Sequence, residues 1–313
     1  MAQGNALENK LVVLVGGSGF VGSQIAQGLL ESGARLRIAS RHPEEARKLK
    51  PLANLGQMQL VHCDVKKPET LRACLNGADA VVYLVGTFGP DAKDLHAEGA
   101  RIAADEAARQ GAESFVYISS MAADAESEGR YASTKAQGEK LVAEAFPTAT
   151  VLRPSVIFGE DDAFINMFAK LISFMPALPI FGPDKPVQPV WVNDVAQSVN
   201  AAMGNPAKHG GKTYELAGPE TFTMEELHQA IAKEQGRSPA FIPVPDPLSA
   251  VFAALPLTPM SSEQWDMLKA GSVAAGKLPG LAQLGITAKT LSLFLGKWML
   301  RYRKQGRFSV DTT

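Results

Sequence analysis

Cysteine is scarce in this sequence, since Cys63 and Cys74 are the two among 313 residues. Their spacing matches no metal-binding or redox motif, so we expect them to pack as small apolar side chains in a reducing compartment, with no metal site. Net charge is also small, because 31 Lys and Arg face 32 Asp and Glu. A chain without a net positive field does not attract nucleic acid in general, so no nucleic-acid partner is expected.

Long apolar runs are missing as well. No run reaches the roughly 18 residues that a membrane-spanning helix needs. Residues 1–10, MAQGNALENK, contain neither the apolar core of a secretion signal nor an Arg-rich amphipathic pattern. The remaining composition, 46% hydrophobic and 20% charged, is that of an ordinary globular protein. The length allows one large domain or two smaller ones that share a core.

The strongest local pattern is a strand, a glycine-rich turn and a helix. Residues 11–15 are all apolar, as in a buried parallel strand, and residues 23–31 have a helical pattern. Between them, Gly16 permits a tight turn, Gly19 lets the backbone approach a pyrophosphate, and Gly22 lets helix and strand pack closely. The helix N-terminus would offer its free N–H groups to the phosphates. This context predicts a dinucleotide-binding turn, although the G-x-x-G-x-x-G spacing also fits an ordinary glycine-rich loop.

The second strand, residues 34–40, ends in Ser40, Arg41 and His42, without an acidic residue. An NAD-selective site usually has an acid here, bonded to the ribose 2′-hydroxyl. Arg41 can instead clamp a 2′-phosphate, and Ser40 can donate to the same group. The pattern favours NADP(H) over NAD(H). The alternative is a solvated arginine, with the ribose contact made elsewhere.

Strands and helices continue to alternate, which predicts a doubly wound α/β fold with a parallel sheet. A third strand leads into Asp64, which can accept from an adenine amino group or cap the following helix. A fourth strand, residues 80–85, ends at the small residues Gly86 and Thr87, which let a dinucleotide lie against the strand ends. His96, on the next helix, is expected to be an ordinary surface or core residue.

A reactive constellation follows the strand at 114–118, which runs into Ser119 and Ser120. Tyr131 and Lys135 are four residues apart, so they share one face of a helix. The Lys135 ammonium, together with an oxidised nicotinamide, would favour the Tyr131 phenolate and lower its pKa from roughly 10. Tyr131 can then exchange a proton with a substrate oxygen that the Ser120 hydroxyl holds.

Taken in order, the glycine turn, Asp64-Val65, Ser120 and Tyr131-x-x-x-Lys135 resemble the extended or atypical short-chain dehydrogenase/reductases. The segments VLRPSVIFG, QPVWVNDVA and KTYELAGPE further along the chain resemble later strands and turns of that family. The ordered set is similar in particular to the branch that includes the accessory subunit of respiratory complex I and its bacterial relatives, described as NAD-dependent epimerase/dehydratase-like. This resemblance covers nearly the whole chain.

The resemblance implies a tightly held NADPH and a role in the assembly or stability of complex I, without demonstrated turnover. It implies a peripheral location at the cytoplasmic side of the bacterial inner membrane. The expected catalytic residues are Ser120, Tyr131 and Lys135. The residues expected to contact the cofactor lie in the glycine turn, at strand ends and in the site helix: Gly16, Ser18, Gly19, Phe20, Val21, Gly22, Ser40, Arg41, Asp64, Val65, Val85, Gly86, Thr87, Ser119, Tyr131, Lys135, Pro154 and Val156.

Two other functions stay open. The chain can be an active NADP-dependent reductase or epimerase that uses Ser120, Tyr131 and Lys135 on a carbonyl or sugar-nucleotide-like substrate. It can also be a regulator that senses NADPH against NADP. Either function would use the same dinucleotide site.

The second half of the chain has a different pattern. We expect a Rossmann domain over residues 1–158, completed by about 187–204, and a smaller α/β region over 159–186 and 205–313. Within this region, residues 174–181 are a Pro-broken apolar stretch that can line a hydrophobic substrate pocket, contact a partner, or form a loop that covers the core. Residues 243–247 look like a stiff linker.

The smaller region also contains a helix-capping motif and a basic, aromatic tail. Thr223 and Glu226 have the spacing of a capping box that opens a helix. The tail, residues 291–308, suits an anionic lipid surface or an acidic partner, or is a solvated basic helix end. Its basic and aromatic residues are Lys297, Arg301, Arg303, Lys304 and Arg307, with Trp298, Tyr302 and Phe308.

Overall fold

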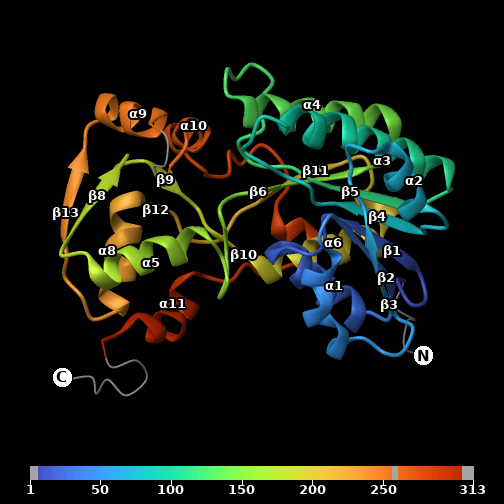
Figure 1. Ribbon diagram of the computed structural model, residues 1–313, viewed down its shortest axis with the longest axis horizontal. Coiled ribbons are helices and arrows are strands. Elements are labelled where there is room, and N and C mark those ends of the chain that lie inside the picture. Colours follow the sequence, from blue (N-terminus) through green and yellow to red (C-terminus); the bar gives the residue numbers. More distant parts are fainter. Residues whose placement is uncertain (1–5, 256–259, 305–313) are drawn as a thin grey trace. The chain divides into compact units, whose positions relative to one another are not determined.

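The computed structural model describes residues 6–255 and 260–304. The chain forms two compact units (Figure 1). Unit 1 consists of Met1–Pro154, Val192–Leu216 and Ala275–Thr287. Unit 2 consists of Ser155–Trp191, Ala217–Ala274 and Ala288–Thr313. Each unit has its own hydrophobic core.

A seven-stranded parallel sheet forms the centre of unit 1, with the order β11-β6-β5-β4-β1-β2-β3. The strands are β1 (Leu11–Val15), β2 (Arg35–Ser40), β3 (Met58–His62), β4 (Ala80–Tyr83), β5 (Ser114–Ile118), β6 (Thr150–Pro154) and β11 (Thr213–Leu216). The winding direction reverses between β1 and β4. In such sheets the crevice at the carboxyl ends of these two strands is where ligands bind. The predicted doubly wound fold is therefore confirmed.

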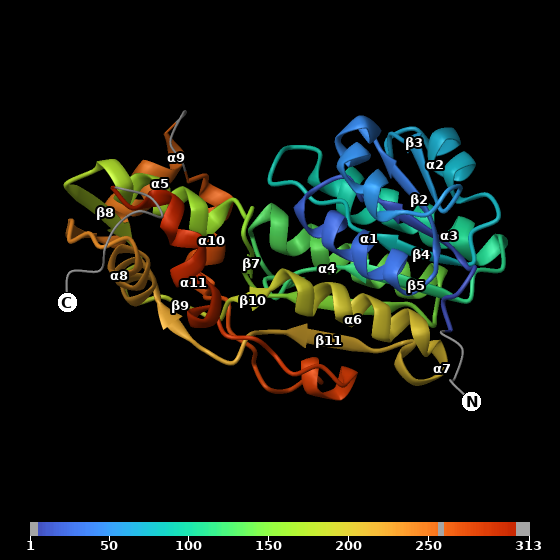
Figure 2. The same cartoon turned by 90° about the horizontal axis from the view of Figure 1, so that it is seen from below.

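Helices cover both faces of this sheet (Figures 1 and 2). One face carries α2 (Pro68–Leu75), α3 (Gly99–Arg109) and α4 (Arg130–Ala145), and the other carries α1 (Phe20–Glu31) and α6 (Val192–Gly204). The short helix α7 (Pro206–His209) leads into β11. Because both faces are covered, β4 and β5 are buried along their whole length, which accounts for their continuous apolar sequences.

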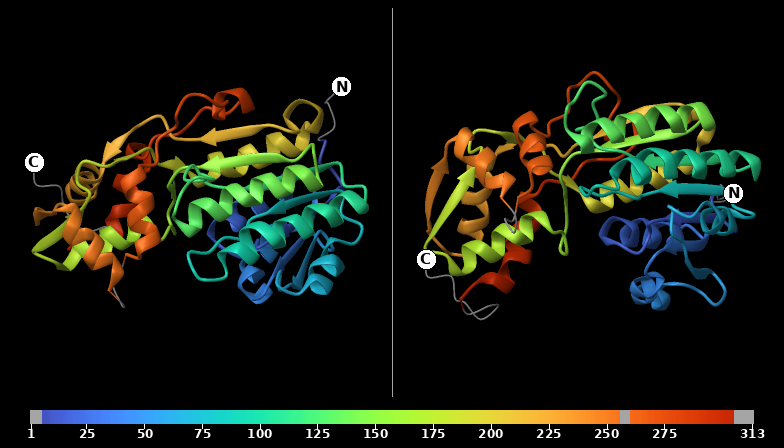
Figure 3. Two further views of the ribbon diagram at one scale, coloured as in Figure 1. Left: turned by 90° about the horizontal axis from the view of Figure 1, so that it is seen from above. Right: turned by 45° about the horizontal axis from the view of Figure 1, so that its top comes forward.

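Unit 2 is built from helices and short strand pairs (Figure 3). Its strand pairs are β7 (Ile157–Phe158) with β10 (Val190–Trp191), β8 (Ala177–Phe181) with β13 (Ala240–Val244), and β9 (Pro186–Val187) with β12 (Phe222–Thr223). Its helices are α5 (Phe164–Phe174), α8 (Met224–Glu234), α9 (Asp246–Ala254), α10 (Ser262–Ala270) and α11 (Ser292–Met299). A core of aromatic and aliphatic side chains between α5, α8 and α11 includes Phe158, Ile172 and Leu227.

The sequence pattern of unit 2 is confirmed in one place and corrected in two. The capping box is confirmed, since Thr223 Oγ1 accepts from Glu226 N at 3.1 Å and the Glu226 carboxylate accepts from Thr223 N at 2.7 Å. Most of the apolar stretch at 174–181 is strand β8, paired with β13, rather than a loop, and its Leu178 and Ile180 side chains belong to the core of unit 2. The expected linker at 243–247 is instead the end of β13 and the start of α9.

The unit boundaries differ from the expected ones after residue 204. Strand β11 lies beside β6 in the main sheet, so residues 205–216 belong to unit 1 rather than to the smaller region. Ala275–Thr287 also returns to unit 1, where the Pro279 carbonyl accepts from Glu215 N at 2.9 Å. The backbone hydrogen bonds of the edge strand hold both segments, and local sequence patterns do not show such long-range pairing.

Candidate dinucleotide and Ser-Tyr-Lys site

The turn after β1 has the geometry that the glycines predict. Gly16 has φ +84°, and a Cβ there would lie 3.0 Å from the Val85 side chain. A Cβ on Gly22 would lie 2.5 Å from the Gly17 carbonyl oxygen, so only glycine lets the helix pack on the turn. In front of Gly19 there is open space, with no heavy atom within 4 Å of an added Cβ. Because Gly19 caps α1, this space faces the free first-turn N–H groups of the helix and fits a pyrophosphate.

The other predicted contacts near this turn have local partners. The Ser18 hydroxyl lies 3.5 Å from a Glu45 carboxylate oxygen. At the end of β2, Ser40 Oγ accepts from His42 N at 3.1 Å, and Arg41 is exposed. Asp64 does not cap α2, whose first residue is Pro68. Its carboxylate instead accepts from Lys66 N at 3.1 Å, in a local turn next to Val65.

Tyr131 lies in the first turn of α4 and is partly buried. Its phenol is hydrogen-bonded to the Ser120 side chain. The Phe88 ring stacks on the Tyr131 ring, with centroids 4.6 Å apart, and the His96 ring meets it edge-on at 5.3 Å. The structure therefore brings Ser120 and Tyr131 together. It adds Phe88 as a cover that the sequence patterns did not indicate.

Lys135 is buried one turn further along α4. Its Nζ donates to the Ile118 carbonyl at 2.9 Å and to the Val85 carbonyl at 3.4 Å, and lies 5.2 Å from the centroid of the Tyr117 ring. These carbonyls belong to the chain at the ends of β5 and β4. Lys135 thus bridges the two strand ends at which a dinucleotide is expected to lie.

Burial shifts the pKa values of both side chains. It lowers the pKa of Lys135 to about 7, an effect that the nearby Glu139 carboxylate partly offsets. It raises the pKa of Tyr131, because phenolate is disfavoured away from water, and the Ser120 hydrogen bond offsets only part of this rise. In the protein alone the direction for Tyr131 is thus opposite to the expected lowering. A lowered phenol pKa would need the positive charge of an oxidised nicotinamide.

Ser119 is held in a polar cluster on α4 and β6. Its hydroxyl donates to Glu139 Oε1 at 2.5 Å, and Arg153 forms two hydrogen bonds with the same carboxylate, at 2.8 Å and 2.5 Å. Glu139 and Arg153 also line a hollow of about 530 Å³ between α4, β6 and β11. The Ser119 side chain is therefore engaged in this cluster, so a contact with the cofactor would have to come from its backbone.

The remaining predicted residues lie near the strand ends of their own units. The Pro154 carbonyl accepts from Met121 N at 3.0 Å, which joins the end of β6 to the chain just after Ser120. Val156 belongs to unit 2, where its carbonyl accepts from Val190 N at 2.9 Å.

His96 is the functional candidate that the sequence patterns missed. It is fully buried, which agrees with one of the two expectations, but its contacts go beyond ordinary core packing. Its Nε2 accepts from Thr87 N at 2.9 Å, directly after the Val85-Gly86 segment that Lys135 contacts. His96 lies 13 residues after Tyr83, the last residue of β4, and this spacing predicts no contact, because only tertiary packing brings the ring back to Thr87.

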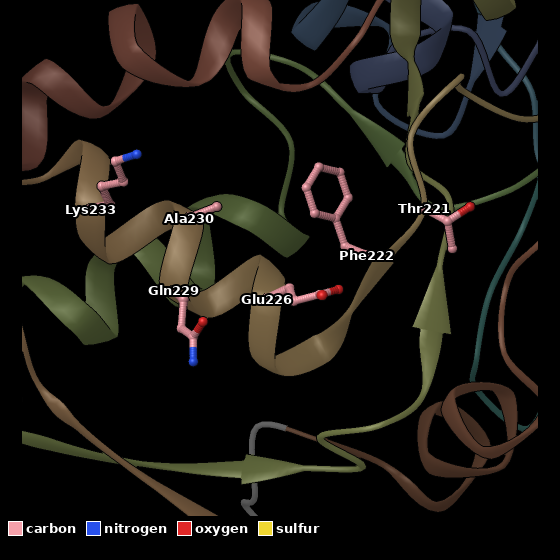
Figure 4. A pocket seen from close by; sticks show the side chains of 6 residues that line it. All are labelled: Thr221, Phe222, Glu226, Gln229, Ala230 and Lys233. Atoms are coloured by element: carbon pink, nitrogen blue, oxygen red, sulfur yellow. The ribbon is translucent and has the colours of Figure 1, made fainter.

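A hollow in unit 2 contains none of these residues. It has a volume of about 440 Å³ and runs along the outer face of α8 (Figure 4). Glu226, Gln229 and Lys233 line it, with Phe222 and Thr221 at the start of the helix. The Glu226 carboxylate already accepts a backbone N–H in the capping box, so this hollow offers no second reactive constellation.

No group of three or more His, Cys, Asp or Glu side chains in the described segments is arranged to hold a metal ion. None of the helices over residues 6–255 and 260–304 is both long enough and apolar enough to cross a bilayer. Cys63 and Cys74 are buried free thiols with sulfurs 3.6 Å apart.

Comparison with known proteins agrees with this geometry. A family model described as NAD(P)H-binding matches residues 16–165, which are the glycine turn through the Tyr131 and Lys135 helix and beyond. The fold resembles that of a nucleoside-diphosphate-sugar epimerase from Staphylococcus aureus, with a TM-score of 0.74, 20% identity, and coverage of 91% of this chain and 99% of that one. Residues 16–165 therefore match an NAD(P)H-binding domain, and the fold is like that of this epimerase, with a Rossmann-like parallel sheet.

In sequence the chain is homologous to subunits of the mitochondrial NADH dehydrogenase (ubiquinone). It is 31% identical to the NADH dehydrogenase (ubiquinone) 1 alpha subcomplex subunit 9 of Arabidopsis thaliana over 78% of this chain, and it spans 62% of that protein. It is 28% identical to the subunit of the same name from Rattus norvegicus, over 96% of this chain and 82% of the rat protein. The chain thus spans about three fifths of the plant relative and most of the rat relative.

Proposed function

We propose that this protein is an NADP(H)-binding accessory subunit of the respiratory NADH:ubiquinone oxidoreductase. In this role it would support assembly or stability of the complex. It would be peripheral, at the cytoplasmic side of the bacterial inner membrane. The observation that supports this proposal best is homology to subunit 9 over nearly the whole chain, combined with a glycine turn that fits a pyrophosphate.

The direct test is purification of the full chain, carrying an affinity tag, from native membranes. We expect the other subunits of the complex to co-purify and NADPH to be released when the protein is denatured. A parallel preparation from cells with the tag on an unrelated peripheral membrane protein is the control. A chain found wholly in the soluble fraction, without those subunits, would contradict the proposed role.

The preference for NADP(H) is supported by Arg41, which is exposed at the carboxyl end of β2. A bidentate arginine–phosphate contact contributes about 1.5–3 kcal/mol, which corresponds to roughly 10- to 100-fold in affinity. Arg41→Ala should therefore weaken NADPH binding by this factor and leave NADH binding unchanged. Arg47→Ala, in the exposed segment that follows, removes the same charge as a matched control. Equal losses for both cofactors would remove the argument for NADP(H).

Contact with an anionic membrane surface through the tail is part of the proposal, although fewer tail residues are available than the sequence suggests. Arg301 donates to the Glu160 carbonyl and to Asn166 Oδ1, the latter at 2.7 Å. Arg303 Nε donates to the Glu234 carbonyl at 2.9 Å. Arg307 and Phe308 lie outside the described residues. Lys297 and Lys304 are thus the described basic residues of the tail on which the membrane contact would depend most.

Reductase or epimerase activity is the second candidate, and the Ser120–Tyr131 hydrogen bond favours it. A bound nicotinamide supplies hydride transfer at its ring. Ser120 would hold a substrate oxygen, and Tyr131 would give it a proton, or take one from it, through the phenol. If the purified protein oxidises NADPH with a carbonyl substrate, Tyr131→Phe should abolish turnover while NADPH still binds. Turnover that survives this substitution would rule out the assigned proton transfer.

A further inference from the structure

A single turn of π-helix, Asp94–Glu98, precedes α3. In a π-turn the hydrogen bonds of an α-helix are displaced, so carbonyl groups need other partners. Two of them find buried tyrosines: the Leu95 carbonyl accepts from Tyr83 Oη at 2.6 Å, and the His96 carbonyl accepts from Tyr117 Oη at 2.9 Å. Both phenols are fully buried in the core. The π-turn is therefore a fixed part of the core.

Two glycines make room for these hydroxyls. A Cβ on Gly99 would lie 2.6 Å from Tyr83 Oη. A Cβ on Gly138, in α4, would lie 2.4 Å from Tyr117 Oη and 2.2 Å from the His96 carbonyl oxygen. The π-turn is thus pressed against the same helix that carries Tyr131 and Lys135. Its position relative to those side chains is set by backbone contact.

The two ring nitrogens of His96 have different partners. Nε2 faces a backbone N–H, that of Thr87 at 2.9 Å, so it must be the acceptor. Nδ1 lies 2.9 Å from Thr134 Oγ1, which in turn donates to the Arg130 carbonyl at 2.6 Å. The Thr134 hydroxyl is therefore the acceptor for a proton on Nδ1. These partners assign the neutral Nδ1–H tautomer, and burial, with the Lys135 charge, lowers the pKa of His96 to about 3, so the ring stays neutral.

The segment that His96 holds is the one that Lys135 also contacts. Lys135 Nζ reaches the Val85 carbonyl, and His96 reaches the Thr87 amide two residues later. Gly86 lies between Val85 and Thr87, and a Cβ built onto it would be 3.8 Å from Lys135 Nζ and 3.9 Å from His96 Nε2. The ring of Phe88, which follows Thr87, stacks on the Tyr131 ring. The chain after β4 is therefore held at two backbone groups, the Val85 carbonyl and the Thr87 amide.

We propose that His96 is a positioning residue of the dinucleotide site, which fixes the Gly86–Thr87 backbone relative to Lys135 and Tyr131. It acts through Thr87 and not by touching the cofactor. The inference rests on the proposed binding of a nicotinamide dinucleotide at this edge of the sheet. Its role is to keep the strand end in the geometry against which the nicotinamide half lies, so that binding does not first have to order this segment.

Two substitutions separate this role from ordinary packing. In His96→Gln the side-chain carbonyl reaches the place of Nε2 and can accept from Thr87, whereas the Thr134 contact is lost. In His96→Asn the amide reaches only the place of Nδ1, so it can donate to Thr134, and the Thr87 N–H loses its acceptor. Both variants remove one ring from the core, so both should lose thermal stability. Only His96→Asn should release the segment at the end of β4.

The measurement is the NADPH dissociation constant of the full chain by calorimetry, with the unfolding midpoint measured in parallel. We expect His96→Asn to weaken binding at least tenfold and His96→Gln to stay within about threefold of the wild type. The matched control is His209→Gln. It alters another buried histidine of unit 1, whose Nδ1 lies 2.8 Å from Tyr214 Oη, and it should lower the unfolding midpoint without changing affinity. Equal affinities of the Asn and Gln variants would overturn the proposal.

A second readout does not need the cofactor. Hydrogen exchange of the Thr87 amide should be slow in the wild type and in His96→Gln and fast in His96→Asn, and nitrogen NMR of the wild-type ring should show the proton on Nδ1. If the wild type binds neither NADPH nor NADH, the proposed function fails, and the Thr87 exchange rates then decide the positioning role by themselves. Equal exchange in the wild type and His96→Asn would show that His96 does not hold the Thr87 amide.

Discussion

Replacing Gly19 by aspartate tests the pyrophosphate site without disturbing the fold. Gly19 has φ −78° and ψ −172°, which any residue adopts, and an added Cβ meets no heavy atom within 4 Å. It is also the N-cap of α1, a position at which aspartate is among the preferred residues. Gly19→Asp should therefore leave the stability of the protein unchanged or raise it by a few tenths of a kcal/mol.

The same carboxylate would stand where a diphosphate has to approach the helix N-terminus. Two unit charges about 4 Å apart near a protein surface repel each other by about 4 kcal/mol at an effective dielectric constant of about 20. Because about 1.4 kcal/mol corresponds to a factor of ten, the dissociation constant should rise by about three orders of magnitude. Salt weakens this effect, since the site is open to solvent.

The assay is calorimetric titration with NADPH, with the thermal midpoint measured on the same samples. Gly19→Asn is the matched control, because asparagine has nearly the same shape and is an equally good N-cap but has no charge. We expect the Asn variant to lose far less affinity than the Asp variant. If both variants bind NADPH alike, the phosphates do not lie at this turn and the reasoning is refuted.

Three further predictions concern the stability of the fold. Gly138→Ala should lower the free energy of unfolding by about 3 kcal/mol, because the new Cβ would overlap the His96 carbonyl oxygen. Gly204→Ala is the control and should be neutral or stabilising, because its Cβ meets no heavy atom within 4 Å; equal urea midpoints of the two variants would contradict the prediction. The pKa of the Lys135 amine falls to about 7 on folding, so between pH 7 and about 10 the unfolded state binds one more proton at this residue than the folded state does. The free energy of unfolding should therefore rise with pH more steeply in the wild type than in Lys135→Met. Parallel pH profiles of the urea midpoint in the two proteins would count against a buried amine. Thr223→Ala removes the N-cap of α8 and should destabilise unit 2 by about 1 kcal/mol in thermal unfolding. Thr221→Ala, at an exposed position nearby, should change the unfolding midpoint little. Equal effects of the two substitutions would show that the capping box adds no stability.

The core of the dinucleotide site follows from local sequence. The roles of Gly16, Gly19 and Gly22 depend on a strand, a turn and a helix that follow one another in the chain. The spacing of the glycines in the sequence is therefore enough to predict the geometry of the turn. The same holds for Tyr131 and Lys135, which one helical turn places on one face, and for the capping box at Thr223. In each case the physical cause acts over a few residues.

Other features depend on parts of the chain that are distant in sequence. Strand β11 joins the main sheet through hydrogen bonds with β6, some 60 residues earlier in the chain. The pKa of Tyr131 is raised by burial that many segments create together. His96 resembles any other helical histidine until packing brings its ring to Thr87 and Thr134.

The sequence by itself determined the fold class, the geometry of the glycine turn and the placement of Tyr131 and Lys135 on one helix face, because backbone periodicity and glycine sterics are local properties. Only the tertiary structure decided the membership of β11, the engagement of Ser119 with Glu139 and the buried position of His96. Each of these three features depends on which distant segments pack together and exclude water from their contact surfaces. Such packing is a property of the folded chain as a whole and not of any short stretch of sequence.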